Sequence, residues 1–223
     1  MSQNVLLEPS ARFATARALA PRTVSYATEK RVMDLLGSGL LLLALAPLFL
    51  VIALLVKLTS RGPVCYRSRR VGLGGEVFTF IKFRSMYEDA EHRLADLGQQ
   101  NEKDGPIFKM KNDPRITPIG SILRKFSLDE LPQILSVFTG EMSLVGPRPP
   151  LVSEAAQYDA YAAQRLTVKP GLTCFWQVMG RSDLSFEQWM DLDHRYLQEM
   201  SLATDLRLLA MTPTAVLRGR GAY

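Results

Sequence analysis

Two adjacent carboxylates beside a basic pair are the side chains of this chain best suited to chemistry on a phosphate. Asp129 and Glu130 follow Arg124 and Lys125 closely in the sequence. A helix N-terminus and nearby cations both stabilise an ionised carboxylate, and a carboxylate kept ionised and partly unsolvated can attack phosphorus. Adjacent helical residues point about 100° apart, so the two groups can take different roles, with Glu130 as a base or a metal ligand. The plainer alternative is that both residues only cap a helix.

A proline shortly after these carboxylates indicates where the helix begins. Pro132 has no backbone N–H and therefore favours a first helical turn, where that donor has no partner anyway. We therefore expect a helix that starts between Ser127 and Asp129. Ser127 and Glu130 also have the spacing of a capping box, in which each side chain bonds the other residue's backbone N–H.

Further cations are placed where they can hold a phosphate. A predicted strand that ends near Arg84 puts Lys82 and Arg84 on one face. The motif Gly146-Pro-Arg-Pro149 fixes the backbone on both sides of Arg148, and the planar guanidinium of arginine binds phosphate as a fork. Arg181 follows a glycine and is a further candidate to line a site. A solvated strand edge and an ordinary turn are the alternatives for the first two features.

A long apolar segment precedes all of these residues. Residues 35–56 carry no charge, and they would form about 33 Å of helix, enough to cross a bilayer. Pro47 lies near the middle and would kink the helix. Lysine and arginine flank both ends, so the preference of positive residues for the cytoplasm gives no direction. A re-entrant helix broken at Pro47 satisfies both flanks, and a spanning helix is the alternative.

Composition narrows the class of site and partner. Lys+Arg 27 against Asp+Glu 22 leaves a net charge of +5, which suits phosphorylated substrates, anionic lipid or nucleic acid and does not choose among them. Two cysteines, Cys65 and Cys174, are too few for a disulfide framework or a cysteine zinc site. Two histidines, His92 and His194, are also too few for a histidine-based metal site.

The rest of the chain predicts a mixed fold. Residues 64–67 and 77–84 predict a β-hairpin closed by a glycine-rich turn. Residues 86–97 and 116–126 predict short helices. The tail, 186–217, is amphipathic and suits either an anionic lipid surface or packing against the domain. The predicted fold class is therefore α/β and mostly helical, with a re-entrant membrane helix, a small β-hairpin or sheet and amphipathic interface helices.

Several ordered motifs together resemble the bacterial sugar transferase family, the monotopic polyprenol-phosphate phosphoglycosyl transferases. The resemblance covers roughly residues 28–223 and looks closest to members that start exopolysaccharide or capsule repeat units, through residues 105–109 and 218–223. Besides the apolar segment with Pro47, it rests on Lys82-Phe-Arg-Ser-Met86, Leu123-Arg-Lys-Phe-Ser-Leu-Asp-Glu-Leu-Pro-Gln133, Ser143-Leu-Val-Gly-Pro-Arg-Pro149, Lys169-Pro-Gly-Leu-Thr173 and Leu192-Asp-His-Arg-Tyr196.

The resemblance implies a reaction and a set of partners. Asp129 would attack the sugar-side phosphorus of a UDP-sugar and release UMP, and Glu130 would help polyprenol phosphate attack the covalent intermediate. Mg²⁺ would neutralise the diphosphate, with Asp129 or Glu130 as its protein ligand. The expected phosphate contacts are Lys82, Arg84, Arg124 and Arg148, followed by Arg181 and Asp193.

The resemblance also implies an organisation of the chain. Residues 1–28 would form a cytoplasmic arm, 29–58 the re-entrant membrane helix, and 59–223 a catalytic domain on the membrane surface. The location would be the cytoplasmic face of the bacterial inner membrane, with lipid as a partner and no nucleic acid. The sequence does not fix the oligomeric state, and we keep a homodimer as one alternative.

Two departures and one rival accompany this prediction. Members often carry Ser before the helix-breaking proline, where this chain has Ala46, and many carry Gly and Trp where it has Cys174-Phe-Trp176. The rival is a membrane-anchored basic module without catalysis that binds anionic lipid or nucleic acid. It explains the charge and the apolar segment, but it does not explain the adjacent carboxylates or the constrained Arg148.

Overall fold

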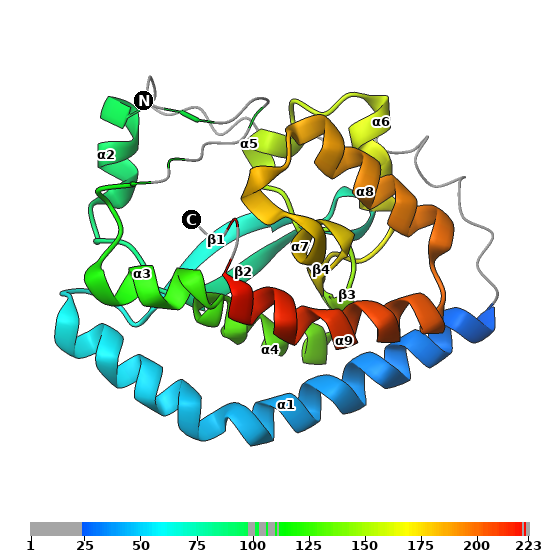
Figure 1. The fold of residues 1–223 in the computed structure, drawn as a ribbon, viewed down its shortest axis with the longest axis horizontal. Coiled ribbons are helices and arrows are strands. Elements are labelled where there is room, and N and C mark those ends of the chain that lie inside the picture. The colour runs from blue at the N-terminus through cyan, green and yellow to red at the C-terminus, as the bar shows by residue number, and fades with distance from the viewer. Residues whose placement is uncertain are drawn as a thin grey trace.

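One long helix and a body packed against it make up the computed structural model, which describes residues 24–97, 101, 102, 106, 110, 112–219 and 221. The helix, α1 (Val24–Thr59), runs along one side of the body (Figure 1). The described part is mostly helical and contains two sheets of two strands each, so the predicted mostly helical fold with small sheets and a long apolar N-terminal helix is confirmed. Residues 1–23 of the predicted arm lie outside the described residues, as do most of the motif 105–109 and part of the ending 218–223.

The elements of the body follow one another closely along the chain. The strands are β1 (Cys65–Val71), β2 (Val77–Phe83), β3 (Ser143–Val145) and β4 (Gly171–Thr173). The α-helices are α2 (Ala90–Leu97), α3 (Pro118–Lys125), α4 (Ile134–Thr139), α5 (Val152–Ala155), α6 (Ala160–Ala163), α7 (Phe175–Met179), α8 (Phe186–Glu199) and α9 (Leu202–Arg218). Short 3₁₀ segments are η2 (Leu73–Gly75), η4 (Leu128–Gln133), η5 (Gln164–Thr167) and η6 (Arg181–Asp183).

Helix α1 is long and apolar, and it bends. It continues through Pro47 as a single helix, and Figure 1 shows it curved so that both ends turn toward the body. It begins at Val24, before the predicted start at residue 29. Its most apolar stretch has a mean hydropathy of 3.0 with only 11% of it buried. By length and composition α1 can cross a membrane, and its exposed apolar surface is unlike the buried core helix of a soluble protein.

Polar side chains tie both ends of α1 to the body. Near the beginning, Lys30 Nζ lies 2.7 Å from Asp205 Oδ2 of α9, and Asp34 Oδ1 accepts a 2.8 Å hydrogen bond from the backbone N–H of Leu144 in β3. Beyond the last turn, the backbone oxygens accept hydrogen bonds from Arg84. The apolar middle of the helix is thus held between two polar anchors on the same body.

Two small sheets organise the body. β1 and β2 form the predicted antiparallel hairpin, with Cys65 opposite Phe83. β3 and β4 form a parallel pair, with Val145 opposite Thr173, which no pattern in the sequence indicated. Each of these strands has three residues, too few for an alternation of apolar and polar side chains to be visible.

The main core lies between the hairpin, the parallel pair and the C-terminal helices. Phe80, Val145, Phe175, Tyr196 and Leu208 are among its buried side chains, so residues far apart in sequence share it. A second cluster joins the late part of α1 to β2 and α3. Its fully buried members are Ile52, Val56, Phe83 and Leu123.

The predicted amphipathic tail is two helices with different surroundings. α8 buries Trp189, Met190 and Tyr196 in the body. α9 buries Leu208 but leaves Leu217 72% exposed. Packing against the domain therefore accounts for α8, whereas α9 also presents apolar side chains outward.

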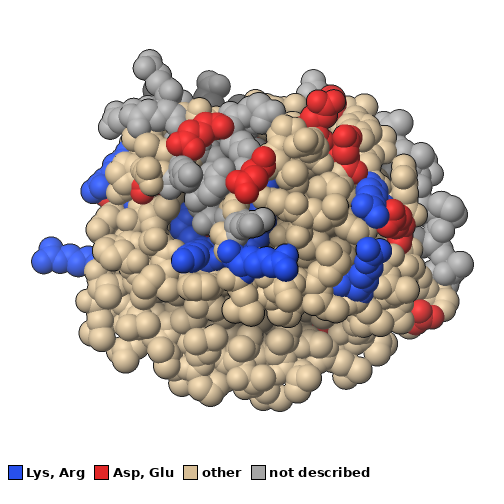
Figure 2. Space-filling model, viewed as in Figure 1, with Lys and Arg blue, Asp and Glu red and all other residues tan. Residues whose placement is uncertain are grey.

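Charge is unevenly distributed on the face that Figure 2 shows. In this view Lys, Arg, Asp and Glu gather over the part of the body away from α1, and the surface around the middle of α1 carries none of them. Exposed apolar side chains of α1 and α4 include Leu43, Leu50 and Phe138. A contiguous apolar surface of this kind suits contact with lipid.

Candidate active site

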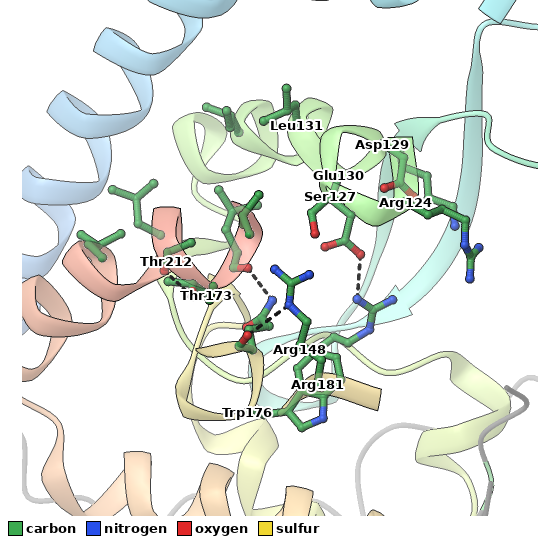
Figure 3. Close-up of a pocket in the computed structure, with 18 of the residues that line it drawn as sticks. Arg124, Ser127, Asp129, Glu130, Leu131, Arg148, Thr173, Trp176, Arg181 and Thr212 are labelled. Carbon is green, nitrogen blue, oxygen red and sulfur yellow. Dashed lines mark hydrogen bonds and ion pairs between the residues drawn. The ribbon is translucent and has the colours of Figure 1, made fainter. Parts of the chain in front are cut away.

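A cavity of about 280 Å³ lies where η4, the loop after β3, α7, α9 and α1 meet. It contains most of the predicted site residues (Figure 3). Its charged lining residues are Lys82, Arg124, Asp129, Glu130, Arg148 and Arg181. Its apolar lining residues include Leu41, Leu45, Ile134, Leu144, Leu209 and Val216. The cavity thus joins a charged wall to an apolar wall, and α1 supplies part of the apolar one.

Asp129 is the buried carboxylate of the charged wall, with 5% of its surface exposed. Burial raises the pKa of Asp129 above its ordinary value, and the charge of Glu130 adds to this, whereas Lys82, Arg124 and Arg148 oppose it. A carboxylate that is poorly solvated and surrounded by cations is more basic than one in water and still has partners for its charge. This combination suits a nucleophile toward phosphorus.

The local backbone around Asp129 differs from the predicted one. The segment begins at Leu128, as expected, but as the 3₁₀ turn η4, and the Ser127 side chain makes no capping hydrogen bond. The predicted capping box is therefore wrong, because Ser127 adopts a left-handed backbone with φ 52°. Lys125 is exposed and lies over the ring of Phe126. As predicted, Arg124 lowers the pKa of Asp129, but burial is the largest influence and raises it.

Glu130 and Arg148 form an ion pair across the cavity. Arg148 Nη1 donates to Glu130 Oε1 at 2.7 Å, and both side chains are about one quarter exposed (23% and 24%). Burial disfavours the charge on Arg148, but Glu130, together with Glu154 and Asp129, outweighs this and raises the pKa of Arg148. Figure 3 shows Arg148 and Arg181 both extending toward Glu130. The pair keeps a guanidinium in the cavity, with its remaining donors available to an anion.

Two glycines hold the loop that carries Arg148. The backbone N–H of Gly146 donates to Thr173 O, and that of Gly171 donates to Pro147 O, each at 2.9 Å. A Cβ on Gly146 would lie 2.4 Å from the backbone oxygen of Lys169, so no other residue fits there. The constrained loop predicted from the two prolines is therefore also fixed by close backbone contact with β4.

Lys82 and Arg84 have different surroundings, although they lie two residues apart in one segment. Lys82, paired with Tyr66 across the hairpin, lines the cavity, and burial lowers the pKa of Lys82 to about 8 despite the charge of Asp129. Arg84 lies after β2 and is not among the lining residues. Its guanidinium donates to the Ser60 backbone oxygen at 2.9 Å and to that of Arg61. The structure thus places Arg84 on the end of α1 instead of on substrate.

Arg181 lines the cavity from an uncommon backbone conformation. Its φ is 52°, and its Nε donates to the backbone oxygen of Gln177 at 3.2 Å. Burial lowers the pKa of Arg181, with Glu130 opposing. A non-glycine residue in this region costs free energy and tends to occur at functional sites.

Asp193 lies outside the cavity. Its side chain is fully buried and pairs with Arg165 at 2.8 Å, and burial raises the pKa of Asp193 to about 6 in spite of Arg165. The turn of α8 directs this carboxylate into the core. The structure therefore does not place Asp193 among the phosphate contacts.

Some residues that line the cavity were not predicted as site residues. Thr173 of β4 and Thr212 of α9 share a 2.8 Å hydrogen bond between their hydroxyl oxygens in the cavity wall. Trp176 and Gln177 of α7 also line it, and Gln177 Oε1 is buried without a partner among the described residues. Only the departure noted at Cys174-Phe-Trp176 drew attention to α7. Nothing local indicated Thr212.

The sequence comparisons identify the family of this chain. The model of the family described as bacterial sugar transferase matches residues 25–219. The chain therefore belongs to the bacterial sugar transferase family, and it is an enzyme of the phosphoglycosyl transferase type. This excludes the rival of a basic module without catalysis.

Its similarity extends to several named relatives. It is 43% identical to the exopolysaccharide production protein ExoY of Sinorhizobium fredii, over 87% of this chain and 88% of that one. It is 41% identical to the undecaprenyl-phosphate galactose phosphotransferase of Salmonella typhimurium, over 87% of this chain and 41% of the relative. It is 38% identical to the UDP-glucose:undecaprenyl-phosphate glucose-1-phosphate transferase of Caulobacter vibrioides, over 97% of this chain and 80% of the relative.

Proposed function

We propose that this protein transfers a phosphosugar from a UDP-sugar to undecaprenyl phosphate, giving a polyprenol diphosphate sugar and UMP, as the first step of an exopolysaccharide, capsule or O-antigen repeat unit. The observation that carries this proposal is the two-sided cavity. A cation-lined carboxylate pair faces an apolar wall that α1 and α9 supply. A charged donor and a lipid-linked acceptor can meet at such a boundary.

Asp129 acts as the nucleophile in this proposal. One carboxylate oxygen attacks the phosphorus that bears the sugar, the bond from that phosphorus to the oxygen of the UMP phosphate breaks, and UMP leaves. The product is a phosphosugar bound covalently to Asp129. The burial of Asp129 and the cations around it support this role.

Glu130 acts on the second half of the reaction. It accepts a proton from the polyprenol phosphate or orients it, and a phosphate oxygen of that acceptor attacks the same phosphorus. The bond to Asp129 breaks, and the free carboxylate returns. The position of Glu130 beside Asp129, held by Arg148, supports this division of roles.

Four cations can neutralise the diphosphate and the charge that develops during transfer. Lys82, Arg124, Arg148 and Arg181 line the same cavity as the carboxylates. Phosphoryl transfer depends mainly on positioning and charge stabilisation. Arginine supplies forked donors for this purpose, whereas lysine supplies a compact charge.

The donor set of the cavity also fits Mg²⁺. This ion is commonly held by one or two carboxylates together with substrate phosphates and waters, and Asp129 and Glu130 supply two adjacent carboxylates. When bound, Mg²⁺ would neutralise charge on the diphosphate. The described residues contain no group of three or more acidic, histidine or cysteine side chains suited to a metal, so phosphate oxygens would have to complete the coordination.

The form of α1 supports a re-entrant anchor at the cytoplasmic face of the bacterial inner membrane. Both ends of the helix are tied to one body, and Figure 1 shows the helix curving away from that body between them. The exposed leucines of its middle would lie in lipid. Undecaprenyl phosphate would then reach the cavity past Leu41 and Leu45.

The test is UMP release by the purified protein in nanodiscs. We expect release from one member of a panel of UDP-sugars in the presence of Mg²⁺ and undecaprenyl phosphate. Asp129→Asn should lower kcat by about 10³-fold or more. The exposed carboxylate variant Asp89→Asn should retain activity, because Asp89 pairs with Arg93 on the surface and does not line the cavity. Folded protein that releases no UMP from any UDP-sugar would contradict the proposal.

A further inference from the structure

A layered stack of side chains lies directly behind Arg148. The guanidinium carbon of Arg148 is 5.9 Å from the centroid of the Trp176 ring, and Figure 3 shows these two side chains next to each other. Trp176 stacks on Trp189 with centroids 4.5 Å apart. The guanidinium of Arg165 lies over the other ring, 4.9 Å from the centroid of Trp189. Two cations therefore enclose two indoles.

Arg165 is also bonded to the main chain of the residue it supports. Its Nη2 donates to the backbone oxygen of Arg148 at 2.8 Å, and its Nη1 donates to the hydroxyl of Tyr158 at 2.9 Å. Asp193 pairs with the same Nη2 at 2.8 Å, and both charged side chains are 1% exposed or less. Arg165 thus contacts the backbone of Arg148 directly. It also supports the side chain of Arg148 through the two stacked indoles.

Stability alone does not account for this buried pair. Removing two charges from water costs several kcal/mol per ion, and a well-packed apolar pair often stabilises a fold as much or more. Neither Arg165 nor Asp193 lines the cavity, so neither contacts substrate there. Their placement fixes the guanidinium plane of Arg165 behind the loop of Arg148. A planar guanidinium binds phosphate best when its geometry is fixed in advance.

We propose that Arg165 and Asp193 are positioning residues that orient Arg148 toward the diphosphate of the donor, acting through the Arg148 backbone oxygen and the Trp189–Trp176 stack. This inference rests on the proposed function, since it assumes a diphosphate in the cavity. It assigns the two residues no contact with substrate. It requires that the effect of Arg165 on donor binding depend on the presence of the Arg148 side chain.

A double-mutant cycle on UDP affinity tests this dependence. UDP with Mg²⁺ is titrated calorimetrically into the protein in nanodiscs, for the wild type, Arg165→Lys, Arg148→Ala and the double variant. Lysine keeps the charge but loses the guanidinium, whose Nη2 contacts both Arg148 and Asp193 and whose Nη1 bonds Tyr158. We expect Arg165→Lys to weaken UDP binding about tenfold, or about 1.4 kcal/mol, and to have less than a twofold effect in the Arg148→Ala background.

The pair Asp113–Arg115 supplies a matched control. It is an ion pair of 2.6 Å with side chains 8% and 4% exposed, and neither residue lines the cavity. Asp113→Asn should lower thermal stability and leave UDP affinity unchanged. If Arg165→Lys does not fold, Tyr158→Phe replaces it in the cycle, because it removes only the hydroxyl bonded to Arg165; its expected effect is about threefold, again absent without Arg148.

Two results would overturn the inference. One is full UDP affinity in folded Arg165→Lys or, where that variant is replaced, in Tyr158→Phe. The other is an equal loss of affinity with and without Arg148, as a purely structural role would give. UMP release by the wild-type preparation separates these outcomes from failure of the proposed function. With release intact only the positioning role fails, whereas without release the proposed reaction fails and the inference fails with it.

Discussion

At the scale of single residues, burial determines what the charged groups of the cavity can do. Asp129 and Lys82 are both drawn by burial toward their neutral forms, and each partly restores the other's charge. A pair of this kind responds strongly to an arriving diphosphate, because the anion adds to the charge that favours protonated Lys82. The same balance makes the site sensitive to pH.

Lys82 should limit activity at alkaline pH. Its pKa is lowered from 10.5 to about 8, so it is charged below about pH 8 and neutral above. The attraction for the donor diphosphate is therefore lost as pH rises, and kcat/KM should fall by up to about tenfold per unit above pH 8. Lys82→Arg should remove this fall, since arginine stays protonated. The prediction fails if the pH profile of Lys82→Arg matches that of the wild type.

Arg84 tests the distinction between a structural and a substrate-binding cation. Replacing it with Met removes charge-assisted hydrogen bonds to the carbonyls that follow α1, so we expect a loss of about 2–4 kcal/mol in the free energy of unfolding. KM for the UDP-sugar should stay within about twofold, because Arg84 is not among the lining residues. A selective rise in KM with unchanged stability would instead assign Arg84 to the donor.

At the scale of elements, α1 is both an anchor and a wall of the site. Its beginning is held by Asp205 of α9 and its end by Arg84 after β2. Between these two contacts, Leu41 and Leu45 of α1 line the cavity. A change in the path of α1 through the membrane would therefore alter the cavity itself.

The path of α1 can be tested by labelling. With Cys65 and Cys174 replaced by Ser, single cysteines introduced by Ser25→Cys or Thr59→Cys should both react only from the cytoplasmic side. Pro47→Ala restores a helix hydrogen bond and favours a straight helix, so one of the two positions should become partly reactive from outside. Opposite sides in the parent protein would establish a spanning helix, and an unchanged pattern in Pro47→Ala would argue against the kink.

What the sequence could predict follows from the range of the interactions involved. The hairpin, the apolar helix and the adjacent carboxylates close to Arg124 arise from local patterns, and they were predictable. The parallel pairing of β3 with β4 depends on Gly146 and Gly171, whose backbones meet only in the folded chain. The bonding partners of Arg84 could not be predicted either, because strand alternation predicts the face on which a side chain lies but not the group that it contacts.

At the scale of the whole molecule, charge and apolar surface separate across the cavity. The face in Figure 2 carries its charged side chains away from the middle of α1, and the cavity lies where η4 meets α1 and α9. A water-soluble donor can approach from the charged side and a lipid acceptor from the apolar side. The arrangement accounts for a reaction between one substrate dissolved in water and another dissolved in the membrane.

The most direct test of this account is the intact mass of the protein after incubation with its UDP-sugar and Mg²⁺, without an acceptor. We predict an increase equal to one phosphosugar, mapped to Asp129 by peptide analysis, together with one equivalent of UMP. The added mass should disappear on addition of undecaprenyl phosphate and never form in Asp129→Asn. Product formation at the normal rate by Asp129→Asn, or turnover by the wild type with no added mass at any time, would contradict the account.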